Sequence, residues 1–70
     1  MRHQKVISDH ITSIGYEPTD RTLEVKFANG SVYQYRGVSE TTHKQFLASP
    51  SHGQFFHHEI KPNFDAERMK

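Results

Sequence analysis

Residues 22–36 read TLEVKFANGSVYQYR, and this stretch decides the fold. In its first half apolar residues (Leu23, Val25 and Phe27) alternate with charged ones, which is the period-two pattern of a half-buried strand. Asn29-Gly30 follows at once, and a second strand-like run continues to Arg36. An Asn-Gly pair between two such runs predicts a β-hairpin.

Two hairpin registers fit this sequence, and they place the tyrosines differently. A two-residue type I′ loop sets Tyr33 and Tyr35 opposite charged residues, away from the apolar face. A three-residue loop, with Gly30 left-handed in a G1 bulge, pairs the two tyrosines with Val25 and Leu23 and places both rings in the core. We favour the bulged register because a slip of one residue flips every side chain, and only this register puts the large rings on the apolar side.

Further elements flank the hairpin. β-Branched residues favour a strand from Ser8 to Ile14, and the Glu17–Asp20 segment, which contains a proline, predicts a turn. Ser39 is a suitable N-cap for a helix over Glu40–Ala48, which Pro50 would end.

The C-terminal third is harder to assign. Its two phenylalanines and Ile60 predict a further short strand or an irregular segment over Gln54–Ile60. Met1–Gln4 and Glu67–Lys70 should be loose. We therefore predict one α+β domain over residues 1–70, ordered from about residue 6 to 66, in which a small antiparallel meander or hairpin sheet of about three or four strands packs with one short helix.

Length and composition narrow the class of protein. The chain has 70 residues and no cysteine, which excludes disulfide and thiolate chemistry and favours a reducing compartment, so we expect a cytoplasmic protein. It has no apolar run near the ~20 residues of a membrane span, so no membrane association is expected. The formal net charge is +1, and protonating all six histidines would raise it to +7. Any nucleic-acid binding therefore needs a local basic patch.

No pattern in the sequence indicates catalysis or a cofactor. No serine lies in a G-x-S-x-G turn, the carboxylates fall on turns and solvent faces, and the glycines form no phosphate loop. His57-His58-Glu59, with His52 upstream, contains metal-ligand residue types. In an extended segment neighbouring side chains point to opposite faces, so we expect no metal site. The sequence predicts a protein that is not an enzyme.

The remaining candidate is a nucleic-acid-binding strand face. Strand aromatics flanked by cations can stack bases and hold phosphates, although tyrosines at i and i+2 are also common in core-edge packing. The candidate residues are Lys26, Tyr33, Tyr35, Arg36, Phe56 and Lys61.

The order of these features resembles the KTSC domain. The resemblance rests on Ile14-Gly15-Tyr16, the strand 23–27, Asn29-Gly30, the Tyr33-Gln34-Tyr35 motif and Gly37-Val38, and it continues through 46–49, 51–53, Phe55-Phe56, Ile60-Lys61 and Phe64. That family is named after the C-terminal extension of some lysyl-tRNA synthetases and also occurs as small bacterial and phage proteins with a central Tyr-x-Tyr motif. Three positions differ from its usual pattern: His57 stands for asparagine, Lys61 for arginine and Phe64 for tyrosine.

The resemblance implies a compact α+β domain, and attachment to a synthetase implies RNA as its partner. We expect salt-sensitive RNA binding that strengthens as the histidines become charged at low pH. The alternative is a protein–protein interaction module that uses a strand edge or a Phe55-Phe56 patch. In either case we expect a monomer or a weak homodimer.

Overall fold

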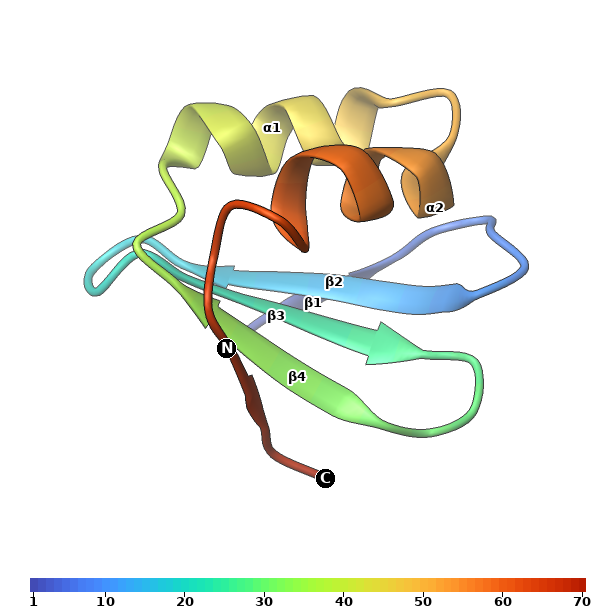
Figure 1. Cartoon of the computed structure of the whole chain (residues 1–70), viewed down its shortest axis with the longest axis horizontal. Helices are drawn as coiled ribbons and strands as arrows, with labels where there is room; N and C mark the ends of the chain where they lie inside the picture. The colour runs from blue at the N-terminus through green and yellow to red at the C-terminus, as the bar shows by residue number, and fades with distance from the viewer.

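The computed structural model describes all 70 residues. Figure 1 shows a twisted antiparallel sheet with helices packed over one of its faces, so the expected α+β class is confirmed. The sheet has five strands instead of three or four, in chain order: β1 (His3–Lys5), β2 (Ile11–Glu17), β3 (Thr22–Phe27), β4 (Val32–Arg36) and β5 (Ala66–Arg68). The helices follow β4: α1 (Glu40–Ala48), α2 (His52–Phe55) and a π-helical segment, η1 (Phe56–Ile60).

The hairpin between β3 and β4 has the bulged register. Val25 pairs with Tyr33 and Leu23 with Tyr35. Gly30 has φ 91°, and its N–H donates to the carbonyl of Phe27 at 2.9 Å. A left-handed residue at this position is what a three-residue loop with a G1 bulge requires. Both tyrosines therefore point toward the helices.

The core lies between the sheet and the helices. Eight apolar residues are buried there: Ile11, Ile14, Leu23, Val25, Tyr35, Val38, Phe46 and Ile60. They come from β2, β3, β4, the segment after β4, α1 and η1, and Phe55 of the short α2 packs against them, so a single core joins the sheet to every helix. The other face of the sheet carries no helix (Figure 1).

Helix α1 forms as predicted. The hydroxyl of Ser39 accepts a hydrogen bond from the N–H of Thr42 and caps the N-terminus. Tyr16 on β2 holds this end of the helix in place: its hydroxyl donates to the carbonyl of Val38 at 2.6 Å, and its ring stacks on His43 with centroids 4.6 Å apart. Tyr16, part of the motif that carried the family resemblance, thus has a structural role.

The prediction for Gln54–Ile60 is wrong, because this segment is helical. The Ser51 hydroxyl accepts from the N–H of Gln54 and starts α2, and η1 continues with a bond from the N–H of Lys61 to the carbonyl of Phe56. The β-forming residues Phe56 and Ile60 are placed by burial of their side chains and not by strand propensity.

The chain ends and the first long strand also differ from expectation. Residues 3–5 and 66–68 are not loose but pair with β2 and β4, forming the two edges of the sheet. Strand β2 begins at Ile11, later than the predicted Ser8, and a register irregularity lies between Ile11 and Ser13.

Candidate nucleic-acid interface

The predicted binding residues divide between the two faces of the sheet. Tyr33, Tyr35, Phe56 and Lys61 line one groove of about 490 Å³ on the helical side, which we call the aromatic groove. Lys26 and Arg36 are exposed and belong to the opposite, open face, because each is one residue out of phase with the core residues Val25 and Tyr35. The structure therefore brings four of the six predicted residues together and separates the two others.

The aromatic groove is built from interlocking rings. Phe27 contacts Tyr33 edge-to-face at 5.8 Å and Phe56 at 5.2 Å, measured between ring centroids. The guanidinium of Arg68 on β5 lies 5.9 Å from the centre of the Tyr33 ring, within cation–π range. Lys61 lies at the rim. Sequence reasoning missed Arg68 because it placed this residue in a loose end.

Tyr35 lines the aromatic groove, but its side chain is buried in the core. It is only 3% exposed and packs against Phe56, with ring centroids 5.6 Å apart. Burial, assisted by the neighbouring Tyr33, raises the pKa of the Tyr35 phenol to about 12. Tyr33 is half-buried and Tyr35 buried, so Tyr33 is the tyrosine with a ring surface available to a ligand.

A polar network occupies the open face. His3 lies between two partners: its Nδ1 is 2.8 Å from the Ser13 hydroxyl and its Nε2 2.5 Å from a carboxylate oxygen of Glu24. The side-chain amide of Gln34 donates to the other oxygen of Glu24 at 2.8 Å. Partial burial raises the pKa of Glu24, but the hydrogen bonds from Gln34 and His3 outweigh it and bring that pKa below its ordinary value.

This network unites a hydroxyl, an imidazole and a carboxylate, but none of the three side chains lines a principal cavity of the molecule. Ser13 is 6% exposed and its hydroxyl is already engaged by His3. A nucleophile needs a substrate site beside it, so we assign the network a structural role in joining β1 to the sheet.

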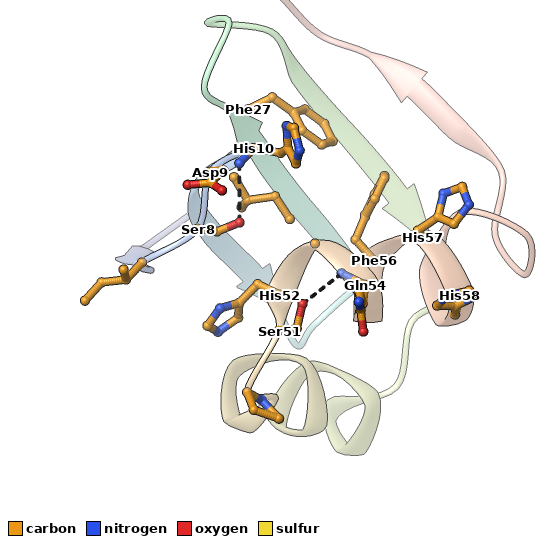
Figure 2. Close-up of a pocket in the computed structure, with 14 residues that line it drawn as sticks. Ser8, Asp9, His10, Phe27, Ser51, His52, Gln54, Phe56, His57 and His58 are labelled. Atoms are coloured by element: carbon orange, nitrogen blue, oxygen red, sulfur yellow. Dashed lines mark hydrogen bonds between the residues drawn. The ribbon is translucent and has the colours of Figure 1, made fainter.

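The largest cavity, about 720 Å³, lies between residues 7–10 and residues 50–58, and we call it the histidine cleft (Figure 2). Four histidines line it: His10, His52, His57 and His58. The premise that His57 and His58 lie on an extended segment is wrong; they are consecutive in η1, with ring centroids 5.3 Å apart. No group of three or more histidine, aspartate or glutamate side chains in the structure is arranged to hold a metal ion.

The structure does not present Phe55 and Phe56 as an exposed patch. Both are half-buried. Phe55 stacks on Phe46 with ring centroids 5.3 Å apart, and Phe56 packs on Phe27 and Tyr35. The large apolar residues that are exposed lie elsewhere: Met1, Ile7 and Met69. No helix of the structure has the length and apolar character needed to cross a bilayer.

These features define a small α+β domain in which one helical layer covers a five-stranded meander and an aromatic groove opens between them. The KTSC domain matches residues 7–64, and the chain belongs to this family. A crystal structure of a KTSC domain protein from Yersinia pestis superposes with a TM-score of 0.92 at 41% identity, over 99% of this chain and 97% of the other.

Similar sequences occur in two contexts. The chain is 41% identical over 59 residues to a lysine–tRNA ligase of a Nostoc species, covering 84% of this chain but only 10% of the ligase. It is 32% identical over 62 residues to an uncharacterized protein of Stutzerimonas stutzeri, covering 89% of this chain and 87% of that protein. The domain thus occurs both as a small part of a tRNA ligase and as most of a short protein.

Proposed function

We propose that this KTSC domain is a non-enzymatic module that binds single-stranded RNA in the aromatic groove. The observation that carries the proposal is the grouping of Tyr33, Phe56 and Lys61 around one groove, with Arg68 beside Tyr33. Single-strand binding sites commonly combine aromatic rings, on which bases stack, with nearby cations, which bind phosphates.

The relatives support RNA as the partner. A lysine–tRNA ligase acts on a tRNA, and a similar domain makes up about a tenth of the Nostoc ligase. A domain that is covalently attached to such an enzyme is held near the bound tRNA. This tethering raises the effective concentration of the domain at the tRNA, so even a weak contact with the tRNA adds to the overall affinity. The absence of cysteine is consistent with work in a reducing compartment such as the cytoplasm.

The charge distribution favours modest affinity. The formal net charge is only +1, and the carboxylate of Asp65 also lines the groove, so few phosphates can be neutralised at once. We expect dissociation constants in the micromolar range or weaker at moderate salt.

Strand-edge pairing with another protein is the less favoured alternative. Both edge strands are only three residues long, and β5 carries the charged residues Glu67 and Arg68. Short, charged edges oppose pairing with a further strand, and for the same reason we propose that the domain works as a monomer.

A binding experiment with matched lysine variants tests the proposal. Fluorescence anisotropy would follow a labelled single-stranded RNA of about eight nucleotides, within the usual site size of such modules. Tyr33→Ala should weaken binding by roughly 5- to 100-fold through lost stacking. Lys61→Gln should weaken it and flatten its salt dependence, because one phosphate contact is lost.

Lys26→Gln is the control, since it removes the same charge from the open face, where Lys26 is exposed and away from the groove. It should leave the affinity nearly unchanged. Equal losses for Lys26→Gln and Lys61→Gln, or binding that does not respond to salt, would exclude the aromatic groove as the RNA site.

A further inference from the structure

The histidine cleft gathers four of the six histidines of the chain from two segments that are distant in sequence. His10 belongs to the loop between β1 and β2, His52 to α2, and the other two to η1. The two walls approach closely: a Cβ built on Gly53 would be 3.9 Å from both His10 Cδ2 and Ser8 Oγ. Figure 2 shows His10 beside Phe27 on one wall and Ser51, His52 and Gln54 on the other.

Most polar side chains of the cleft can donate a hydrogen bond. The Ser8 hydroxyl accepts from the N–H of His10, and the Ser51 hydroxyl accepts from the N–H of Gln54, each at 3.4 Å. Each hydroxyl hydrogen thus remains free to donate to a ligand. Asp9 is the one carboxylate that lines the cleft. A donor-rich cavity with several imidazoles and one acid suits an anion.

The geometry favours an anion over a cation. A bound metal needs three or four converging ligands, and no such group exists in the structure. His52 is already committed to the protein, with Nε2 placed 3.2 Å from the carbonyl of Leu47, so that nitrogen carries the hydrogen. His10 and His57 are exposed and have no side-chain hydrogen bond within the protein, so their ring nitrogens remain free for a ligand.

The histidine cleft and the aromatic groove are adjacent and share two lining residues. Phe27 and Phe56 line both cavities, and their ring centroids are 5.2 Å apart. A strand whose base lies against Tyr33 can therefore continue across these two rings into the cleft. His10 and His57 are among the polar residues that line the cleft.

We propose that the histidine cleft is a second subsite for the same RNA, which receives a backbone phosphate and makes affinity increase as pH falls. This inference rests on the proposed function. Histidine as a residue type changes charge between pH 5 and 8, so we expect the affinity to depend on pH in this range. The carboxylate of Asp9 would partly offset a positive charge on the histidines. The other titratable groups that line the cleft are His52 and His58.

The test compares RNA binding by the wild-type chain and by the double variant His10→Gln/His57→Gln, at about pH 6 and about pH 7.5. Glutamine keeps a donor but carries no charge. The probe is a labelled oligouridylate of about eight nucleotides. The wild type should bind roughly tenfold more tightly at the lower pH and show a steeper salt dependence there. The double variant should lose most of this gain in affinity at the lower pH. At the higher pH its affinity should be closer to that of the wild type.

His43→Gln is the matched control, because His43 lies in neither cavity and stacks on Tyr16. It should keep the pH-dependent gain, and circular dichroism at both pH values verifies that every variant is folded. A double variant that keeps the full gain overturns the subsite while leaving RNA binding in the aromatic groove intact. No binding by the wild type at either pH overturns the proposed function, and the subsite with it.

Discussion

The imidazole of His3 lies over Gly15: a Cβ built on Gly15 would be 2.6 Å from His3 Cδ2. This is far closer than two carbon atoms pack, so the missing side chain makes room for the ring. Only with Gly15 opposite can His3 reach both Ser13 and Glu24 on the open face. A glycine in the middle of β2, which by itself weakens a strand, is thereby explained.

Gly15→Ala should displace the His3 ring and destabilise the protein by about 1 kcal/mol, the size of one or two lost hydrogen bonds. In a His3→Ala background the same change should stabilise it by roughly 0.5 kcal/mol, since alanine is the better strand residue. Urea denaturation of the two single variants and the double variant measures the coupling. Additive effects would contradict the contact.

Thr22 offers a stabilising substitution. Its hydroxyl on β3 is buried and has no hydrogen-bond partner. Thr22→Val replaces that hydroxyl by a methyl group of similar size and should raise the free energy of unfolding by about 1 kcal/mol. Thermal denaturation would detect the gain, whereas a loss of stability would indicate an unrecognised partner for the hydroxyl.

Glu24 should make stability depend on acid pH. Its pKa is lower in the folded chain than in the unfolded one, so the carboxylate stabilises the fold above its ordinary value of 4.5. That contribution is lost as the pH falls through the lowered folded pKa. The difference in unfolding free energy between wild type and Glu24→Gln should therefore be largest near neutral pH and shrink in acid. A difference independent of pH would disprove the assignment.

Tyr35 should tolerate loss of its hydroxyl but not of its ring. Its phenol stays neutral, with a pKa of about 12, and its ring is buried in the core. Tyr35→Phe should cost less than about 1 kcal/mol, whereas Tyr35→Ala should cost about 3–5 kcal/mol as for other large aromatic residues. Tyr35→Phe should also keep the RNA affinity, because this residue supports the groove from below. A strong loss of binding by Tyr35→Phe would give its hydroxyl a direct role.

The hairpin and α1 could be predicted because local signals coincide there. The Asn29-Gly30 pair sets the loop, and alternation of the strand residues leaves one register that places both tyrosines on the helical side of the sheet. Ser39 and Pro50 define the limits of α1, which runs over the predicted Glu40–Ala48.

The second helix was missed although the sequence holds a sign of it. Ser51 is followed three residues later by Gln54, the spacing of a capping box. The prediction rested instead on the two phenylalanines and Ile60, because aromatic and β-branched residues favour strands in general. In the folded chain Ile60 is buried in the core and Phe56 packs against it, and that tertiary packing decides the conformation.

Which residues form the candidate site could not be predicted, because it depends on contacts between residues that are distant in sequence. Lys26 and Arg36 are near the tyrosines in sequence but belong to the other face of the sheet. Arg68 reaches Tyr33 only because β5 pairs with β4 across the whole helical segment. The histidine cleft likewise joins residues 7–10 to residues 50–58.

The order of the strands sets the route by which the chain can fold. The first four strands pair with their sequence neighbours, so each pairing closes only a short loop and can form early and fast. Pairing of β5 with β4 closes a longer loop, residues 37–65, and should therefore form later. The aromatic groove, which needs both η1 and β5, should thus be assembled last and be the first part to open in native-state hydrogen exchange.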